Sequence, residues 1–394
     1  MLEIAYEEYS RACVAFMQEL IRTPSVNGEQ NEKAVADLVV KEAIKLGLVL
    51  RVIETEPDRP NVFVGTGFDS PDGLLLVAHA DTVPVGDESK WQYGPFSGEI
   101  VNGKLYGRGA LDCKGGLAIG LYVLKILQDT GQGHLAKLLS GADEESGADS
   151  QFGIRAVLRE GLKAKGAVYL YGGTLNSECI IGHRGLVRAW VACEGESVHS
   201  GSRDWQERIK GENAIMGIVE FLGELQSVKS DTTSEFFPQY RTVVTPTLIR
   251  GGEGESMVAG RSEALLDIRT LPGDNEKMLG QVRHIAKKLS QGKRRYRVTV
   301  KNTIPAVITD PEAPLVREML ALVKEQLHVD NPVLRGSGPA NESYMLIEAG
   351  IPTITGFGPT GEGFHSPNEY AEVESIKRSL EFLVRLSRRL INAR

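Results

Sequence analysis

Apolar residues at the start of the chain recur at helical spacing. Between positions 2 and 20 they stand three or four residues apart, which predicts an amphipathic helix that ends before Pro24. A second helix is predicted over residues 29–46, where Gly47 ends the pattern. Short β-rich runs follow at residues 48–55, 61–65 and 73–78. The N-terminal part is therefore expected to begin with two helices and to continue in strands.

The last of these runs has the pattern of a strand in the middle of a sheet. Residues 74–78, Leu-Leu-Leu-Val-Ala, are continuously apolar, as in a strand that is covered on both faces. A helix is predicted over residues 114–130, and the apolar strand after it, residues 135–142, stops at three consecutive acids. Strands that alternate with helices in this way predict an α/β domain with helices on both faces of a mixed sheet.

The pattern changes near residue 184 to strands in which apolar and polar positions alternate. Helices are predicted at residues 212–225 and 274–289, among strands at residues 186–193, 242–250, 263–270 and 295–301. The order strand, helix, two strands, helix, strand predicts a small α+β (ferredoxin-like) domain with one helical face.

After about residue 303 the first pattern returns. Helices are predicted at residues 314–327 and 373–389, with a strand at residues 352–356 between them. We therefore expect a discontinuous first domain, residues 1–183 and 303–394, that carries residues 184–302 as an inserted domain. The length of 394 residues agrees with two domains, because a single core rarely grows beyond about 250–300 residues.

Composition places the chain among globular proteins. Hydrophobic residues make up 41% and charged residues 25%, and 45 Lys and Arg against 52 Asp and Glu give a formal net charge of −7. This small acidic excess argues against nucleic acid and membrane surfaces as partners. The four cysteines form no CxxC pair, the N-terminal residues are acidic and no apolar run reaches about 18 residues, so we expect a cytoplasmic protein.

His79 and Asp81 directly follow the apolar strand at residues 74–78. Open α/β sheets bind ligands at this edge, and residues two apart in an extended chain share a face. A histidine held by a neighbouring carboxylate suits a metal ligand, and a hydrogen-bonded loop pair is the alternative.

Other polar clusters also stand beside predicted elements. Asp112 lies in the glycine-rich stretch 107–116 before a helix, where it is either a helix cap or a ligand. The acidic triplet 143–145 ends an apolar strand, and is either a solvated turn or a set of carboxylates crowded around a cation. His365 follows the glycine-rich residues 356–363.

Taken together, these clusters offer two imidazoles and several carboxylates at the ends of strands. This donor set suits zinc, with cobalt or manganese as substitutes. The sequence contains no Walker loop, nucleophile elbow or Rossmann glycine pattern. The residues thus favour a metal site over a phosphate-binding or serine-hydrolase site.

The same motifs resemble those of the M20 metallopeptidase family, which includes acetylornithine deacetylases, succinyl-diaminopimelate desuccinylases and aminoacylases. The motifs are HADTVP at 79–84, GKLYGRGALDCKGG at 103–116, DEESG at 143–147 and HSPNEY at 365–370. The resemblance spans nearly the whole chain. It implies a zinc-peptidase-like catalytic domain with an inserted domain that acts as a lid and in dimerisation.

The resemblance also implies roles for individual residues. Metal ligands are implied at His79, Asp112, Glu145 and His365. In the family, the position of Asp112 bridges two ions and is followed by a cis peptide. Glu144 matches the general base, and Asp81 matches an acid behind the ligands.

In the inserted domain the resemblance implies three further site residues. His199 matches a histidine that stabilises the oxyanion from the partner subunit of a homodimer, and Asn213 and Arg269 match positions that hold the substrate carboxylate. Without the resemblance, His199 would be a surface-loop histidine. Arg269 could equally be a structural residue of its strand.

The sequence departs from the family at one metal ligand. Relatives carry a Glu or Asp shortly before the strand at 182–185, but residues 170–177 contain no acid at the expected place. Glu178 is too far along the chain to be a confident substitute. A one-metal site, a shifted ligand or a loss of hydrolytic activity would each explain the gap.

The sequence therefore predicts a metal-dependent hydrolase that cleaves the amide bond of a small N-acyl amino acid or short peptide, such as a deacetylase or another amidohydrolase. One or two Zn²⁺ ions, or Co²⁺ or Mn²⁺ in their place, are the expected cofactors. Glu144 is the expected general base. The alternatives are a mononuclear enzyme and a non-catalytic relative that binds metal or ligand.

Overall fold

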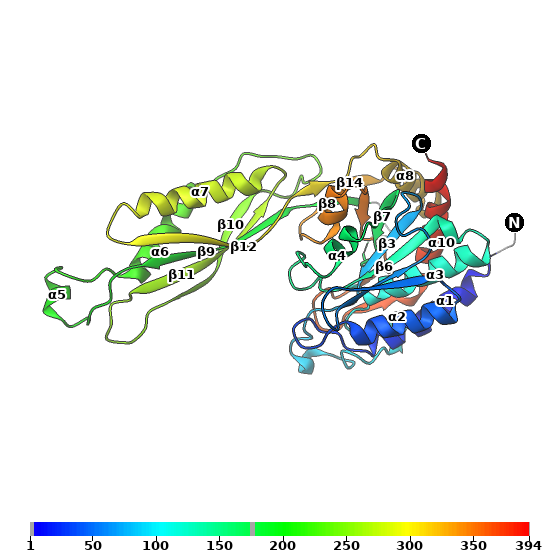
Figure 1. Ribbon diagram of the computed structural model, residues 1–394, viewed down its shortest axis with the longest axis horizontal. Helices are drawn as coiled ribbons and strands as arrows, with labels where there is room; N and C mark the ends of the chain where they lie inside the picture. Colours follow the sequence, from blue (N-terminus) through cyan, green and yellow to red (C-terminus); the bar gives the residue numbers. More distant parts are fainter. Residues whose placement is uncertain (1–3, 174–177, 394) are drawn as a thin grey trace. The chain divides into compact units, whose positions relative to one another are not determined.

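The structure is a computed structural model that describes residues 4–173 and 178–393 (Figure 1). Contacts divide the chain into two compact units. Unit 1 comprises Met1–Gly182, Ile308–Arg335 and Asn341–Arg394, and unit 2 comprises His183–Val307 and Gly336–Ala340. The sequence placed residues 336–340 in the first domain. They group with unit 2 because Gly336 donates a backbone hydrogen bond of 2.7 Å to Phe236 and packs against Phe237.

Unit 1 is built on a mixed sheet, which has nine strands in the part of the chain that is described. The strand β3 (Leu74–His79) lies parallel between β6 (Ala136–Gly141) and β7 (Gly166–Tyr169), and all its residues are buried. This is the central position that the continuous apolar run predicted. The other strands of the sheet are β1 (Leu50–Glu54), β2 (Pro60–Val64), β8 (Glu178–His183), β13 (Val307–Ile308), β14 (Val333–Ser337) and β15 (Thr353–Thr355).

The helix α3 (Lys114–Asp129) packs on β3 and β6. Two further helices, α1 (Tyr6–Ile21) and α10 (Val373–Asn392), pack against α3 in turn. The chain beside the N-terminal end of α3 is so close that a Cβ at Gly116 would lie 2.3 Å from the carbonyl oxygen of Leu170, so only glycine fits there. The other helices of unit 1 are α2 (Lys33–Lys45), α4 (Ile154–Arg159), α8 (Pro314–Leu327) and α9 (Ser343–Glu348), with 3₁₀ turns η1 (Glu88–Lys90) and η2 (Gly133–Leu135).

A second, small sheet in unit 1 joins segments that are far apart in the sequence. Its antiparallel strands follow the order β16 (Gly361–Glu362), β17 (Tyr370–Glu372), β5 (Lys104–Tyr106) and β4 (Ile100–Val101). Tyr370 pairs with Tyr106 and Glu372 with Lys104. The pairing of β17 with β5 therefore brings the late motif at 365–370 beside the glycine-rich motif at 103–116.

Unit 2 is a four-stranded antiparallel sheet with helices on one face. The strand order is β10 (Val243–Gly251), β11 (Arg261–Thr270), β9 (Gly185–Glu194) and β12 (Arg295–Ile304). Alternate residues of β9 form a common core with α6 (Ala214–Glu224) and α7 (Asp274–Leu289), so both helices cover the same face. Short helices α5 (Arg203–Gln206) and η3 (Leu225–Ser227) complete the unit.

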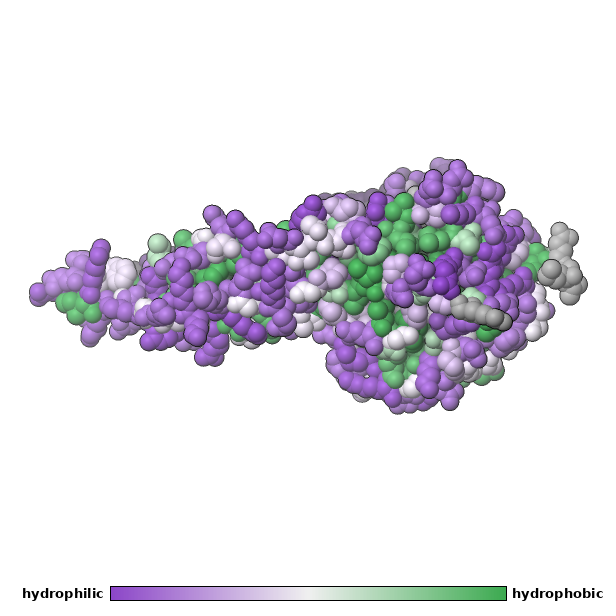
Figure 2. Space-filling model, turned by 90° about the horizontal axis from the view of Figure 1, so that it is seen from above, coloured by the Kyte–Doolittle hydropathy of each residue, from purple (hydrophilic) through white to green (hydrophobic). Residues whose placement is uncertain are grey.

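Hydrophilic residues predominate on the face of unit 2 that Figure 2 displays. Along the described residues, no helix combines the length and apolar character needed to cross a bilayer. The four cysteines are buried and none of them is in a disulfide.

Candidate metal site

His79 is the last residue of the central strand β3, and both of its ring nitrogens face oxygen atoms. Nδ1 lies 2.9 Å from the carbonyl oxygen of Asp81, and Nε2 lies 2.9 Å from Oδ1 of Asp112. Burial lowers the pKa of His79, but the acidic groups around it, Cys113 first and then Asp112 and Asp81, raise it to well above the usual histidine value. The negative charge of these acidic groups favours a cation next to Nε2 of His79.

Asp112 connects the two predicted histidines. Its Oδ1 faces His79, and its Oδ2 lies 3.1 Å from Nε2 of His365. Burial raises the pKa of Asp112, but hydrogen bonds from His365 and His79 lower it more, so the carboxylate is held in its charged form. The residue that caps α3 is Cys113 and it makes no side-chain cap, so the helix-cap alternative for Asp112 is wrong. The peptide bond between Asp112 and Cys113 is cis, as the resemblance implied.

The acidic triplet after β6 turns two glutamates toward the same histidines. Oε1 of Glu145 lies 3.5 Å from Nε2 of His365, and it has no hydrogen-bond partner among the residues described. The acidic neighbours Asp112 first and then Glu145 raise the pKa of His365 to about 10. Burial raises the pKa of Glu144 to about 8, with His79 lowering it and Glu145 raising it. The triplet is therefore a group of crowded carboxylates, and the solvated-turn alternative is wrong.

The ligand atoms of these residues lie close enough together to hold metal. Around His79 and Asp112, ligand atoms within 4.8 Å of one another form three sets: His79, Asp112 and Cys113; His79, Glu144 and Glu145; Asp112, Glu145 and His365. Imidazole nitrogens and carboxylate oxygens are the donors that zinc, cobalt and manganese share. The unsatisfied buried oxygen of Glu145 supports the same conclusion, because a buried charge needs a partner. The residues present thus fit a divalent metal.

Asp81 holds the strand ends that carry the ligands. It is fully buried; its Oδ1 accepts the backbone N–H of Glu144 at 3.2 Å, and its Oδ2 accepts that of Glu145 at 2.9 Å. Asn27 donates a third hydrogen bond to Oδ2 at 2.7 Å. Asp81 Oδ1 also lies 3.3 Å from Nδ1 of His79. Asp81 therefore orients a ligand on β3 and two glutamates after β6 at once.

Replacing Asp81 by Asn should weaken metal binding by about 10–100-fold, as is typical when a residue that orients a ligand is lost. The amide presents one acceptor in place of two, so a backbone N–H or the His79 ring loses its partner. Competition with a chromogenic chelator measures the effect. Asp37→Asn is the matched control, because Asp37 is an exposed acid on α2 that pairs with Lys33. Equal affinities in the two variants would contradict the role given to Asp81.

Glu369 is a further residue of the site, and sequence reasoning assigned it no role. Its Oε1 accepts hydrogen bonds from the backbone of Leu111 at 2.8 Å and of Asp112 at 3.2 Å. Its Oε2 accepts hydrogen bonds from the Arg108 side chain at 2.7 Å and from the backbone of Gly109 at 3.2 Å. Glu369 is fully buried and belongs to the HSPNEY motif. It therefore positions the loop that presents Asp112.

A fourth acidic group, Glu32, Asp81 and Asp143, lies behind the site. Arg59 pairs with Asp143 through a short contact and lies 3.5 Å from Oε2 of Glu32. Burial and the charge of Asp81 raise the pKa of Glu32 to about 7. The guanidinium already supplies the positive charge that this group needs, so we assign no metal to it.

The missing carboxylate is expected near residues 171–173, and within this segment Gly172 has no space for a side chain. Gly172 donates a backbone hydrogen bond of 2.8 Å to the carbonyl oxygen of Leu111, and a Cβ there would lie 2.6 Å from Cδ2 of Leu111. Residues 174–177 lie outside the described residues. Glu178 begins β8 and lies 3.9 Å from Arg335. The departure from the family pattern is therefore also present in the structure over residues 170–173.

The three site residues predicted in the inserted domain all lie in unit 2. His199 is exposed, and its Nδ1 accepts the backbone N–H of Gly201 at 3.0 Å. Asn213 caps α6 through its Oδ1. Arg269 donates to both oxygens of Asp267, at 2.7 and 3.3 Å. The functional roles of these three residues stay predictions.

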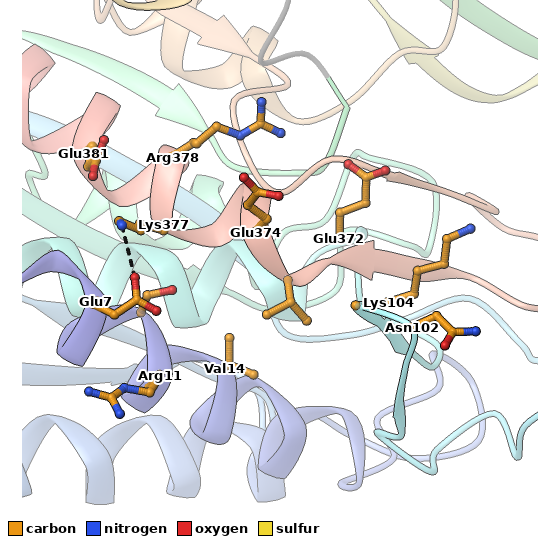
Figure 3. Close-up of a pocket in the computed structure, with 13 residues that line it drawn as sticks. Glu7, Arg11, Val14, Asn102, Lys104, Glu372, Glu374, Lys377, Arg378 and Glu381 are labelled. Carbon is orange, nitrogen blue, oxygen red and sulfur yellow. Dashed lines mark ion pairs between the residues drawn. The ribbon is translucent and has the colours of Figure 1, made fainter.

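A surface cavity of about 900 Å³ in unit 1 contains none of the predicted site residues. Figure 3 shows its lining by α1, α10 and residues 102–104, with acids and bases mixed. Lys377 pairs with Glu7 at 3.0 Å across it. No element of the metal chemistry is present there.

Comparison with known proteins decides the family. The model of peptidase family M20/M25/M40 matches residues 75–389. The chain belongs to this family. The M20 resemblance is thus confirmed, and the chain is a metallohydrolase that acts on amide bonds.

Two curated relatives of this M20 protein are succinyl-diaminopimelate desuccinylases. That of Caulobacter sp. (strain K31) is 30% identical over 71% of this chain and 70% of its own length. That of Methylobacterium sp. (strain 4-46) is 27% identical over 96% and 95%.

Solved structures show the same M20 fold. The metallo-carboxypeptidase Sso-CP2 from Sulfolobus solfataricus has a TM-score of 0.74 at 17% identity, covering 96% of this chain and 99% of that one. The dipeptidase Dug1p from Saccharomyces cerevisiae has a TM-score of 0.73 at 15% identity, covering 98% and 97%. The predicted architecture, a mixed α/β catalytic domain with an inserted domain, is confirmed.

Proposed function

We propose that the protein hydrolyses the amide bond of a small N-acyl amino acid or short peptide, with Glu144 as general base. The observation that carries this proposal is the convergence of His79 and His365 on the two oxygens of Asp112, with Glu145 beside His365 and Glu144 grouped with His79 and Glu145. This arrangement combines metal ligands with a carboxyl group whose pKa is raised, which is what hydrolysis by a metal and a general base needs.

The ligand sets divide the site into two positions. His79 and Asp112 belong to one, and Asp112, Glu145 and His365 belong to the other. When bound, a divalent metal supplies Lewis-acid polarisation of the scissile carbonyl and lowers the pKa of water. Zinc is the proposed metal, with cobalt or manganese as substitutes that accept the same donors.

Glu144 is proposed to move the proton. Its carboxylate accepts a proton from the attacking water and donates it to the nitrogen of the leaving amine. Burial raises its pKa to about 8, so the carboxyl can hold a proton near neutral pH between these two steps. Asp81 fixes the backbone of Glu144, and this contact limits how far the carboxyl can move.

The inserted domain is proposed to bind the substrate. The guanidinium of Arg269 presents a planar fork that suits a carboxylate, and Asp267 holds it in place from one side. Asn213 uses its Oδ1 to cap α6, which leaves its amide Nδ2 as the donor for a ligand. His199, on an exposed loop, is the proposed oxyanion donor from a second subunit.

A homodimer through unit 2 is the proposed assembly. The strand β10 is an edge of its sheet and is largely exposed, and α6 packs beside it. An exposed apolar edge strand is a template for pairing with another copy. The exposed apolar residues are Val243, Leu248 and Ile249 on β10 and Ile215, Met216 and Val219 on α6.

Sedimentation velocity should therefore report the mass of a dimer, and Ile249→Lys should shift it toward the monomer. A charge in the middle of the pairing edge repels its own copy across a two-fold axis. Val52→Lys is the control, because Val52 is an exposed apolar residue of β1 in unit 1. A variant that stays fully dimeric would place the interface elsewhere.

The activity itself is tested by a screen in which metal is added to the purified protein. The panel contains N-succinyl, N-acetyl and N-formyl amino acids and dipeptides, because the curated relatives are desuccinylases and the solved relatives include peptidases. Turnover is expected to disappear with a chelator and to return with Zn²⁺, Co²⁺ or Mn²⁺. If metal binds and no amide in the panel is cleaved, the non-catalytic alternative is favoured.

The cell compartment proposed is the cytoplasm. All four cysteines are buried thiols, which suits a reducing environment.

A further inference from the structure

Cys113 places a thiol inside the ligand cluster. Its Sγ, a ring nitrogen of His79 and a carboxylate oxygen of Asp112 all lie within 4.8 Å of one another. Cys113 is fully buried, and the side chain of His79 is only 2% exposed. Three different ligand types thus meet at the end of the central strand β3.

Asp112, Glu145 and His365 already supply three ligands to one metal position, so the missing carboxylate leaves the other position, at His79 and Asp112, incomplete. At Gly172, in the segment where that acid is expected, the contact with Leu111 leaves no space for a Cβ. A zinc ion takes four ligands, and catalytic sites provide three of them from the protein. His79 and Asp112 supply two protein ligands, so a catalytic zinc at this position needs a third.

We propose that the thiolate of Cys113 replaces the absent carboxylate as the third protein ligand of the metal held by His79 and Asp112. Thiolate, imidazole and carboxylate are all zinc ligands, and a thiolate also suits cobalt. When the bond from sulfur to metal forms, the thiol proton leaves to solvent and no electron is transferred. The proposal rests on the proposed function only in that a metal occupies this position.

Two other acids compete for this role. Glu144 also lies near His79, but the proposed reaction needs its carboxylate for the proton. Glu342 is fully buried, and both of its oxygens lack hydrogen-bond partners within the described residues. Its ligand atoms do not lie within 4.8 Å of any pair of the other donors described, whereas those of Cys113 do. Cys113 is therefore the better third ligand.

Cobalt-loaded full-length protein tests the proposal without substrate. A thiolate bound to Co²⁺ gives a charge-transfer absorption band in the near ultraviolet. The band is expected in the parent protein, absent from Cys113→Ser, and unchanged in Cys13→Ser, where the buried thiol lies on α1 outside the cluster. The Cys113→Ser variant should also bind the metal at His79 and Asp112 about 10–100-fold less tightly than the parent protein does.

A second variant separates ligation from a packing role. Cys113→Asp should lose the band and recover most of the metal affinity, because it supplies a carboxylate in place of the thiolate at the metal position of His79 and Asp112. An absence of the band in the cobalt-loaded parent protein, or an unchanged band in Cys113→Ser, would overturn the proposal. If Glu342→Gln loses a metal equivalent while Cys113→Ser keeps both, Glu342 is the third ligand and the proposal is likewise overturned.

These readouts are independent of catalysis. A protein that shows the band and cleaves no amide would refute the proposed function and leave the Cys113 assignment intact. A protein that cleaves amides and shows no band would support the proposed function and overturn the Cys113 assignment.

Discussion

Glu144→Gln will lower kcat by about 10²–10⁴-fold and leave the bound metal unchanged. The amide is nearly the same size as the carboxyl, but it cannot accept a proton from water or return one to the leaving amine. The residue is fixed by the bond from its backbone to Asp81, so the substitution should not displace the ligands. The loss should appear in kcat more than in KM, because the proton transfer takes place in the transition state.

The measurement combines steady-state kinetics on a substrate from the screen with metal analysis of the same sample. Glu160→Gln is the control, because Glu160 is an exposed acid that pairs with Arg51. Unchanged turnover would show that Glu144 is not the base. A loss of one metal equivalent would show that Glu144 is a ligand, in line with its place in the group with His79 and Glu145.

Arg108→Met will lower the free energy of unfolding by about 3–5 kcal/mol, the usual cost of removing one partner of a buried ion pair. Arg108 is 1% exposed, and Glu369 is fully buried. Without the guanidinium, the carboxylate of Glu369 loses its ion-pair partner and keeps three backbone donors. The loop that presents Asp112 should loosen as a result.

The effect should depend on pH. Burial raises the pKa of Glu369, and Arg108 lowers it again, so the variant should have a still higher pKa at this carboxyl. A carboxyl whose pKa is raised in the folded state favours folding below its unfolded pKa, and this contribution is lost as the pH rises through the folded value. The variant should therefore be less destabilised at acid pH than at neutral pH.

Urea unfolding of the parent protein and the Arg108→Met variant at acid and at neutral pH measures this difference in destabilisation. Arg22→Met is the control, because the partly exposed Arg22 bonds only to backbone oxygens of Ser97 and Gly98 in the described chain. The double variant Arg108→Met with Glu369→Gln should recover part of the loss, since it removes the uncompensated charge. A loss below about 1 kcal/mol in Arg108→Met alone would contradict the role given to the pair.

Long, periodic elements were predictable from the sequence. The helices predicted at 274–289 and 314–327 have these bounds in the structure, because their apolar faces repeat over several turns. The strands of the small sheet were not predicted. Strands of two or three residues, such as β5 and β17, carry no readable period, and their pairing joins residues more than 250 positions apart.

The site shows the same limit. Spacing alone left Asp112 as either a helix cap or a ligand. The cap position of α3 at Cys113 and the contacts of Asp112 with both histidines separate these alternatives. Glu369 was missed because its partners at 108–112 are distant in sequence. The sequence did contain one indication of its role, because Glu369 is an acid within the motif HSPNEY and a turn there does not need an acid. Asn213 shows the opposite case, since the residue assigned to substrate also caps a helix.

The contacts of His365 and Glu369 with residues 108–112 also affect the order in which parts of the protein can fold during synthesis. A ribosome releases the central strands and Asp112 first, then the whole inserted domain, and the segment with both contacts only near the end. Domains tend to fold as they emerge, so unit 2 can form while the loop of Asp112 still lacks its support. A nascent chain that stops before residue 365 would then carry a finished inserted domain and no complete metal site.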